Sequence, residues 1–403
     1  MRSIEEFDGG AGVVVVGGGV AGLAAARELA RRGMGVHVLE SGRLGAQATS
    51  AAGGMLAPQA EADRRDELFE LLCASREAWP SFAEELREES GIDVELDRAG
   101  TLYLALTEED EREVGRRYEW QTREGLEVER LTAREARGIE PEVSPRVRAA
   151  LRFPRDWQVE NRLLVRALAE SAARFGVRFS EGTAATSVRV IAGRAAGVET
   201  SRGFAPAGAV VLAAGAWASR VPLMVTERDT DEARAVEGAH PAVEPVRGQM
   251  LCFARPRESG AFVRHVVYSP RGYVVPRRDG RLLAGSTTER AGFDCSVTPE
   301  GLSAVTSHAV EIAPRLASLT LADSWAGLRP RSEDGLPVLG ESAACAGLFY
   351  ATGYYRNGIL LAPAAARIVA DMVTGVATTL PPRALEAFSP ARFGRTLAAS
   401  RAE

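Results

Sequence analysis

The stretch Gly12–Gly33, GVVVVGGGVAGLAAARELARRG, decides the fold of this chain. Its four valines, Val13–Val16, form a short apolar run that is typical of a strand buried on both faces. Gly17–Gly22 comes next and fits the pattern G-x-G-x-x-G. Apolar residues then recur at helical spacing as far as Gly33. The order of strand, glycine turn and helix predicts the first βαβ unit of an α/β domain.

The glycines of this turn have separate physical roles. Gly17 permits the tight turn, Gly19 lets the backbone approach a pyrophosphate, and Gly22 lets the helix pack closely on the strand. The helix N-terminus at Val20 and Ala21 offers free N–H groups and a partial positive charge to phosphates. The turn therefore predicts a site for an adenine dinucleotide. A purely structural turn is the alternative, because glycine-rich turns are common.

Two further features agree with a dinucleotide site. Val36–Leu39 predicts a second strand, and Glu40 at its end can accept a hydrogen bond from a ribose 2′-OH. The segment Thr49–Pro58 is rich in small residues that let the backbone lie flat against a bulky ring system, and Thr49 and Ser50 add hydroxyls. This segment favours FAD over NAD, whereas the simpler interpretation is a helix start made of small residues.

Composition excludes several classes of protein. The net charge of −5 is too mild to indicate binding to nucleic acid or to a membrane surface. The sequence contains no lysine, which excludes a Schiff-base lysine and a P-loop lysine. No apolar run reaches the roughly 18 residues of a membrane span. The N-terminus lacks the apolar segment of a signal peptide, so we expect a cytoplasmic protein.

Cysteine and histidine usage points to neither disulfides nor a metal. The four cysteines are scattered without a C-x-x-C pair, which predicts reduced thiols at Cys73, Cys252, Cys295 and Cys345. The four histidines show no ligand spacing at His37, His240, His265 and His308. We therefore expect no metal site.

The chain predicts two intertwined domains. An α/β, Rossmann-type FAD-binding domain takes residues 1–60, 145–223 and 320–403. An α+β substrate domain with an antiparallel sheet takes 61–144 and 245–319, where Asp279-Gly280 is a strong hairpin signal. Residues 63–90 predict two helices separated at Pro80. Residues 224–244 are acidic and aperiodic, and we expect a long flexible loop there.

Glycine also ends strands later in the chain. The apolar run Val210–Leu212 leads to Gly215, so we expect it to join the same cofactor sheet. Gly353–Gly358 precedes the last helix, whose N-terminus would direct a partial positive charge at the N1–C2=O edge of a flavin. That charge would favour the reduced, anionic flavin. A docking helix with a glycine-rich turn is the alternative.

Three side chains are candidates for binding a substrate. Arg329 and Arg356 each lie in an apolar, small-residue stretch, and a guanidinium can hold a carboxylate in bidentate fashion. Tyr273 lies on a predicted strand beside the hairpin and could donate its hydroxyl. Surface or ion-paired arginines and a packed sheet tyrosine are the alternatives.

The sequence resembles the D-amino-acid oxidase family of FAD-dependent oxidoreductases, and within it the glycine oxidases of bacterial thiamine biosynthesis. The resemblance covers nearly the whole chain and is most specific at Ala51–Leu56, Trp325–Pro330 and Arg356–Pro363. It implies that Arg329 binds the substrate carboxylate, that Arg356 lies at the flavin and substrate, and that Tyr273 lines the pocket. It also implies flavin contacts at Val20, Ala21, Glu40, Ser41, Ala48, Thr49, Gly53, Gly54, Met55, Ala185, Tyr354, Tyr355, Arg356, Asn357, Gly358, Ile359 and Leu360.

The resemblance implies a reaction as well. Members of the family transfer a hydride from the substrate Cα to flavin N5, which gives an imine, and then pass the electrons to O₂. We therefore expect oxidative deamination of glycine and small amines such as sarcosine and small D-amino acids. The products would be glyoxylate or another 2-oxo acid, ammonia and hydrogen peroxide, feeding the thiazole branch of thiamine biosynthesis. We also expect a homo-oligomer.

Departures from the family pattern leave two alternatives open. Relatives in the sarcosine-oxidase branch attach FAD to a cysteine near the position of Arg329. No cysteine lies there in this chain, so we expect noncovalent FAD. Relatives in the sarcosine-oxidase branch use a lysine to help O₂ react, and this chain has none. One alternative is a membrane-peripheral D-amino-acid dehydrogenase that passes electrons to a quinone. The other is a non-catalytic flavoprotein subunit of a larger complex.

Overall fold

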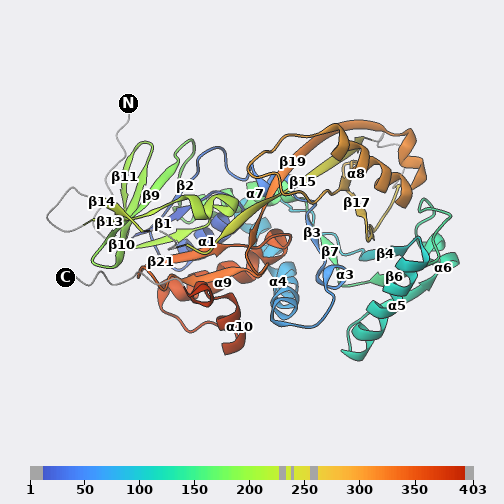
Figure 1. The fold of residues 1–403 in the computed structure, drawn as a ribbon, viewed down its shortest axis with the longest axis horizontal. Helices are drawn as coiled ribbons and strands as arrows, with labels where there is room; N and C mark the ends of the chain where they lie inside the picture. The colour runs from blue at the N-terminus through green and yellow to red at the C-terminus, as the bar shows by residue number, and fades with distance from the viewer. Residues whose placement is uncertain (1–11, 227–232, 237–239, 255–261, 395–403) are drawn as a thin grey trace.

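A six-stranded sheet with β1 (Val13–Val16) near its centre organises one half of the molecule (Figure 1). The computed structural model describes residues 12–226, 233–236, 240–254 and 262–394. The sheet order is β20-β21-β12-β1-β2-β8, and every neighbouring pair is parallel except β20 with β21. The other strands are β2 (Val36–Leu39), β8 (Arg178–Ser180), β12 (Ala209–Leu212), β20 (Val338–Glu341) and β21 (Leu348–Thr352). The expected α/β fold with a parallel cofactor sheet is confirmed.

Both faces of this sheet are covered, which explains why β1 is apolar throughout. Helix α1 (Val20–Arg31) packs against α7 (Asn161–Arg174) and α9 (Gly358–Thr374) on one face. A five-stranded sheet covers the opposite face, and its apolar side chains share a core with β1, β12 and β21. Its strands are β9 (Ala185–Ile191), β10 (Arg194–Thr200), β11 (Gly203–Pro206), β13 (Leu223–Thr226) and β14 (Ala233–Ala235).

An eight-stranded, largely antiparallel sheet forms the other half (right in Figure 1). Asp279-Gly280 turns β17 into β18, as the hairpin signal predicts, and Arg277 N–H donates to the Arg281 carbonyl across the turn. Helix α8 (Pro299–Ile312) shares a core with this sheet. The strands, in sheet order, are β19 (Thr320–Ser332), β15 (Val243–Ala254), β18 (Leu282–Gly285), β17 (Gly272–Pro276), β16 (Val266–Ser269), β4 (Thr101–Ala105), β6 (Ala149–Phe153) and β5 (Glu129–Thr132).

Short elements join the two halves. Strand β3 (Met55–Leu56) pairs with β7 (Trp157–Gln158), and the long pair β15–β19 also contacts η1 (Gly215–Arg220) of the cofactor half. The remaining elements are α2 (Ala48–Ala51), α3 (Pro58–Glu61), α4 (Glu67–Ser90), α5 (Glu108–Arg123), α6 (Ala133–Ile139), α10 (Pro382–Phe388), η3 (Pro314–Ser318) and η4 (Pro390–Phe393). The exact domain boundaries stay a prediction.

The predicted break at Pro80 is wrong, because α4 is one continuous helix (Glu67–Ser90). A proline inside a helix removes one hydrogen bond and costs about 3 kcal/mol. Here Trp79 and Phe82 flank the proline and are buried in the core, with their rings in edge contact at 5.3 Å. Trp79 Nε1 also donates to the Leu360 carbonyl of α9. This packing outweighs the local preference against a helix.

The expectation of a long loop over residues 224–244 is also wrong for the part that the structure describes. Met224–Thr226 of β13 pairs antiparallel with β14, and β13 pairs parallel with β9. Strand β15 begins at Val243. Residues 227–232 and 237–239 lie outside the described residues. The sequence gives no period here because the strands are short and are stabilised by partners distant in sequence.

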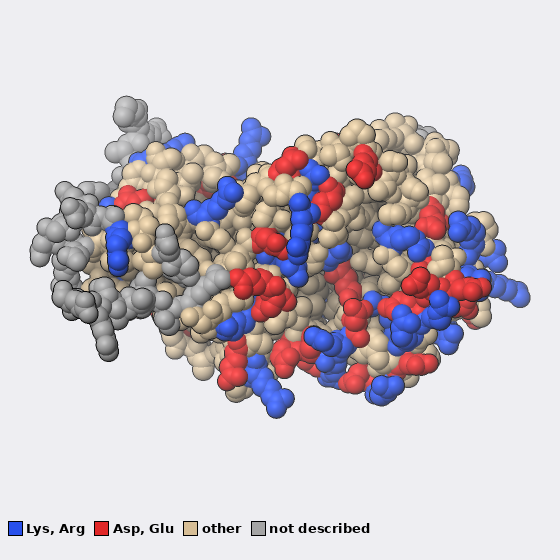
Figure 2. Space-filling model, viewed as in Figure 1, with Lys and Arg blue, Asp and Glu red and all other residues tan. Residues whose placement is uncertain are grey.

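The surface carries charges of both signs. Arginine and acidic side chains are interspersed over the face shown in Figure 2. Within the described residues, no helix is both long enough and apolar enough to span a membrane.

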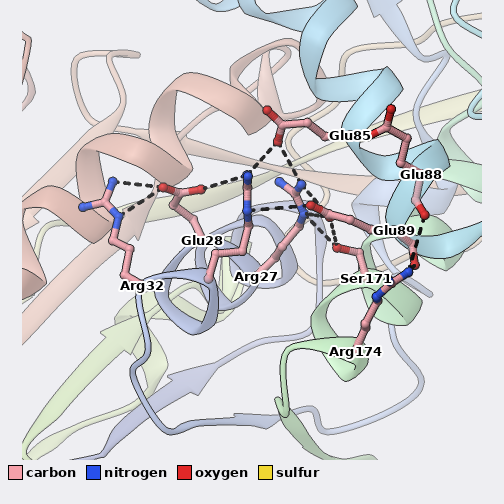
Figure 3. Close-up of polar contacts among 9 residues, drawn as sticks. Arg27, Glu28, Arg32, Glu85, Glu88, Glu89, Ser171 and Arg174 are labelled. Atoms are coloured by element: carbon pink, nitrogen blue, oxygen red, sulfur yellow. Dashed lines mark hydrogen bonds and ion pairs between the residues drawn. The ribbon is translucent and has the colours of Figure 1, made fainter.

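A buried ion-pair cluster holds α4 and α7 on α1 (Figure 3). The Arg27 side chain is 1% exposed and lies 2.6 Å from Glu89 and 3.0 Å from Glu85, both on α4. Arg27 Nε also donates to the hydroxyl of Ser171 on α7, at 2.8 Å. Arg31 reaches the same two carboxylates but is 35% exposed. The cluster therefore depends on Arg27 for its buried contacts.

We expect Arg27→Met to lower the free energy of unfolding by about 3 kcal/mol, because the mostly buried carboxylate of Glu89 would keep only the 3.7 Å contact with Arg31 and Ser171 would lose its buried donor. Arg31→Met is the matched control and should cost at most about 1 kcal/mol, since exposed pairs contribute little. Urea unfolding followed by far-UV circular dichroism measures both. Equal destabilisation by the two changes would contradict the assignment of the cluster to Arg27.

Candidate active site

An elongated cavity runs along the carboxyl ends of β1, β2, β12 and β21 and continues between the two large sheets. Ligands of open α/β sheets bind at this edge. The predicted site residues that line the cavity are Gly17, Gly19, Val20, Ala21, Glu40, Ser41, Ala48, Thr49, Gly53, Gly54, Met55, Ala185, Gly215, Tyr273, Arg329, Tyr354, Tyr355, Arg356, Asn357, Gly358 and Ile359.

The glycine turn has no room for side chains at Gly17 and Gly22, the first and last glycines of the motif. Gly17 has φ +110°, and a Cβ there would lie 2.4 Å from the Ala213 carbonyl oxygen. A Cβ at Gly22 would lie 1.9 Å from the Gly17 carbonyl oxygen. Gly22 therefore packs the helix onto the strand and does not line the cavity. Gly19 lines the cavity, so its backbone is open to a bound phosphate.

Thr49 caps the N-terminus of α1 from a distant part of the chain. Its hydroxyl oxygen accepts a hydrogen bond from the Val20 N–H at 3.0 Å, and the side chain is buried. Among the described residues the hydroxyl donates to no other group, and Thr49 lines the cavity. Ala21, next along α1, also lines the cavity. The helix N-terminus and this hydroxyl together suit an anionic pyrophosphate.

Glu40 organises the turn as well as lining the cavity. One of its carboxylate oxygens accepts from the Gly18 N–H at 2.8 Å, and the other accepts from the Gly42 N–H at 2.8 Å. The Ser41 hydroxyl donates to the latter oxygen at 3.2 Å. A carboxylate oxygen has capacity for a second hydrogen bond, so a ribose hydroxyl can still bind here.

The N-terminus of α9 opens onto the opposite side of the cavity. Gly358 and Ile359, its first residues, line the wall together with Asn357. The first N–H groups of a helix have no partner within the helix and carry a partial positive charge. Leu360 instead faces the core, where its carbonyl accepts from Ser75 and Trp79 of α4. The helix is thereby held with its N-terminus at the cavity.

Arg329 lies at the end of the cavity between the two sheets. Its guanidinium donates to the Ser286 hydroxyl at 2.6 Å and to the Thr287 carbonyl at 3.1 Å. The guanidinium crosses Gly248, where a Cβ would lie 2.2 Å from Nη2. No carboxylate of the described residues forms an ion pair with Arg329. Its charge is therefore available to an anionic ligand.

Arg356 and Glu61 add opposite charges to the same region. Arg356 is solvent-exposed and donates to the Thr288 hydroxyl at 3.0 Å. Burial raises the pKa of Glu61, while the attraction of Arg356, Arg329 and Arg117 opposes that rise. The cavity thus presents both cationic and carboxylate groups to a small ligand.

Tyr273 forms part of the wall and is almost fully buried, with its hydroxyl directed at the Met250 sulfur at 3.3 Å. Its ring stacks on Tyr268, which in turn stacks on Tyr103, with centroid separations of 5.7 and 5.6 Å. A Cβ at Gly53 would lie 3.2 Å from the Tyr273 ring. The tyrosine and the small-residue segment are therefore in contact across the cavity.

Four of the predicted cofactor residues do not line the cavity: Gly22, Ser50, Gly353 and Leu360. The Ser50 hydroxyl donates to the Gly45 carbonyl at 2.6 Å. Gly353 has φ +74°, and a Cβ there would lie 3.0 Å from Val338. These residues shape the backbone around the cavity and do not face it.

Glu61 lines the cavity although no sequence pattern predicts it. It is the last residue of α3, whose backbone N–H groups at Gln59 and Ala60 donate to the buried carboxylate of Asp156. In the sequence Glu61 is one of 54 acidic residues and has no motif around it. No motif marks Gly248, Ser286 and Thr287 either, although the Arg329 guanidinium crosses Gly248 of β15 and donates to the other two just after β18.

We expect Thr49→Val to weaken FAD binding about 5- to 30-fold, because loss of a hydrogen bond from this hydroxyl to the cofactor costs about 1–2 kcal/mol. Ser50→Ala is the matched neighbour and should change FAD affinity little, since its hydroxyl does not line the cavity. Titration of apoprotein with FAD, followed by quenching of flavin fluorescence, gives both dissociation constants. If the two changes weaken binding equally, the hydroxyl of Thr49 does not serve the cofactor.

The cavity fits an FAD molecule on the observations above. The glycine turn has no room for side chains at Gly17 and Gly22, and the N-termini of α1 and α9 both open onto the cavity. Glu40 lines the cavity directly after β2, where an acidic residue can bind a ribose hydroxyl. Comparison with known proteins agrees. Residues 12–372 match the DAO family, described as FAD dependent oxidoreductase.

Similar proteins match over most of this chain. It is 38% identical over 363 residues to a glycine oxidase of Geobacillus kaustophilus, covering 90% of this chain and 92% of the relative. A crystal structure of glycine oxidase from Geobacillus kaustophilus superposes with a TM-score of 0.86 at 36% identity, covering 95% of this chain and 98% of that one. The chain is also 35% identical to a bifunctional protein ThiO/ThiG of Trichormus variabilis, covering 90% of this chain and 52% of that protein. The chain belongs to the DAO family of FAD-dependent oxidoreductases.

Proposed function

We propose that the protein catalyses the oxidative deamination of glycine and other small amino acids or N-methylated amines, with FAD bound noncovalently. The observation that carries the proposal is Arg329, whose guanidinium has no ion-pair partner in the described residues and lines the FAD cavity beside Gly248. A guanidinium in this setting suits a substrate carboxylate. A glycine oxidase relative at 38% identity supports the same substrate class.

The chain's own residues would bind and orient the substrate. Arg329, held by Ser286 and Thr287, would form a bidentate pair with the carboxylate. Glu61 would attract the substrate amine, and Tyr273 and Met250 would exclude water from Cα. Bound FAD supplies the ring that accepts a hydride. The N–H groups at the start of α9 would stabilise negative charge that develops opposite them.

The identity of the electron acceptor is part of the proposal. We infer O₂ as the acceptor, so that glycine, water and O₂ give glyoxylate, ammonia and hydrogen peroxide. The thiazole branch of thiamine biosynthesis as the destination, a cytoplasmic location and a homo-oligomeric state follow from the resemblance and stay predictions. The absence of lysine from the sequence keeps a dehydrogenase that uses another acceptor as the second candidate.

The function is tested by anaerobic reduction of the holoenzyme. Flavin absorbance should fall when glycine or sarcosine is added under nitrogen, and readmitted air should restore it with formation of peroxide. The other products should be glyoxylate with ammonia from glycine, and glyoxylate with methylamine from sarcosine. Bleaching without recovery in air, but with recovery on adding a quinone analogue, would favour the dehydrogenase. No bleaching by any small amino acid would refute the proposal.

The binding of the substrate carboxylate gives the sharpest prediction. Removal of one partner of a buried charged pair costs about 2–5 kcal/mol. Arg329→Ala should therefore raise the dissociation constant of glycine about 30- to 5,000-fold, at about tenfold per 1.4 kcal/mol. Arg329→Lys should also bind poorly, because an ammonium cannot reproduce the planar fork. Rapid-mixing measurements of flavin reduction give these constants.

Two controls isolate the contact. Arg331→Ala on the same strand removes an arginine paired with Glu244 and should leave glycine binding unchanged. Ethylamine, which lacks a carboxylate, should lose much less affinity than glycine in Arg329→Ala, and FAD content should stay constant. If glycine binding is unaffected, or if both substrates weaken equally, Arg329 is not the carboxylate anchor.

A further inference from the structure

Arg277 is a buried arginine that the mechanism above does not use. It lies just after β17 in the eight-stranded sheet and is 7% exposed. Its Nη1 donates to the Val159 carbonyl and the Gln158 side chain, at 2.9 and 3.0 Å. Its Nη2 donates to the Gly53 carbonyl and the Asn161 side chain, at 2.9 and 3.1 Å. All four acceptors are neutral.

These contacts hold the small-residue wall of the FAD cavity, which is the segment Thr49–Pro58, on the side that faces away from the cavity. The Asn161 amide that Arg277 contacts also donates to the Thr49 and Ser50 carbonyls, at 2.7 and 3.1 Å. The Val159 N–H donates to the Gly54 carbonyl at 2.9 Å. The carbonyls of residues 49, 50, 53 and 54 therefore all bind donors outside their own segment, and three of these four contacts depend on Arg277 or on the amide that it contacts.

The orientation of one carbonyl fixes the orientation of the next N–H. In a planar trans peptide the C=O and N–H bonds point in opposite directions. The Gly53 carbonyl faces Arg277, so the N–H of Gly54 faces the other way, and Gly54 lines the cavity. Within the described residues this N–H donates to no other group. A Cβ at Gly54 would lie 2.1 Å from the Val159 carbonyl oxygen, so no side chain covers it.

The charge of Arg277 is also uncompensated at contact distance. No carboxylate of the described residues lies within 4 Å of its guanidinium, although Glu160 attracts it from farther away. Burial lowers the pKa of Arg277 to about 10, which leaves it cationic at neutral pH. One peptide group, Gly53–Gly54, separates this cation from the cavity.

We propose that Arg277 is a positioning residue for the flavin: it directs the Gly54 N–H at the isoalloxazine ring, and its charge favours the reduced, anionic form. The proposal rests on the FAD site of the proposed function and not on the identity of the amino-acid substrate. Arg277 acts through the peptide and does not itself line the cavity.

The test uses sulfite, which adds its lone pair to flavin N5 and leaves a negative charge on the ring, in the reconstituted holoenzyme without amino acid. Arg277→Met should raise the dissociation constant of sulfite about tenfold or more. It should also lower the two-electron midpoint potential, by about 30 mV for each tenfold loss in the equilibrium constant for flavin reduction. Arg277→Lys keeps the charge but loses the fork, so its shift should be smaller.

Arg278→Met is the matched control. Arg278 is the next residue, is 51% exposed and pairs with Asp93 at 2.8 Å, so sulfite affinity and potential should stay as in the wild type. Wild-type values in FAD-loaded Arg277→Met would overturn the proposal, even if FAD binding were weaker, because a merely structural residue does not change flavin electronics. The readout needs no substrate, so a failure here is distinct from a failure of the glycine oxidase activity.

A second measurement, on the wild type, tests the proposal even if the variants fail to fold. In a crystal structure of the wild-type holoenzyme, Gly54 N should lie within hydrogen-bond distance, about 2.7–3.2 Å, of an isoalloxazine nitrogen or oxygen. A Gly54 N–H that points away from the ring would refute the proposal without any substitution.

Discussion

The close packing of α1 on β1 is the constraint on which the site depends. Gly22 lies so near the Gly17 carbonyl that a Cβ would clash at 1.9 Å, and only this approach brings the N-terminus of α1 to the end of the strand. Val20 then presents its N–H to Thr49, and Glu40 accepts from Gly18. A site for an anionic cofactor follows from backbone geometry, before any charged side chain contributes.

Buried polar contacts between distant segments set the remaining geometry. Arg27 joins α4 and α7 to α1, and Ser75 and Trp79 of α4 bind the Leu360 carbonyl, which places the start of α9 at the cavity. Arg277 joins the antiparallel sheet to the small-residue wall. In each case one side chain satisfies backbone or side-chain groups of another segment, so that losing it would leave buried polar groups without partners.

The two halves contribute different chemistry to one cavity. The parallel sheet supplies helix N-termini, glycines and Glu40, which suit a dinucleotide. The antiparallel sheet supplies Arg329 and Tyr273, while Glu61 comes from the connecting helix α3. A substrate bound at Arg329 would therefore meet the flavin at the boundary between the sheets.

The sequence by itself determined what local pattern encodes. The glycine turn, the all-valine strand and Glu40 predict the dinucleotide site because all of them lie within one βαβ unit. Asp279-Gly280 predicts its hairpin because the turn depends only on neighbouring residues. Arg329, Arg356 and Tyr273 were singled out from their surroundings and from the family resemblance, and the fold brings all three to one cavity.

Tertiary structure alone decided the rest, because packing and pairing act between residues far apart in the chain. Pro80 stays helical since Trp79 and Phe82 are buried, and residues 223–226 become a strand by pairing with β9 and β14. Glu61 enters the cavity because Asp156 fixes α3, and Arg277 reaches Gly53 across 224 positions of sequence. No periodicity or motif marks such residues, since what distinguishes them is which groups the fold places beside them.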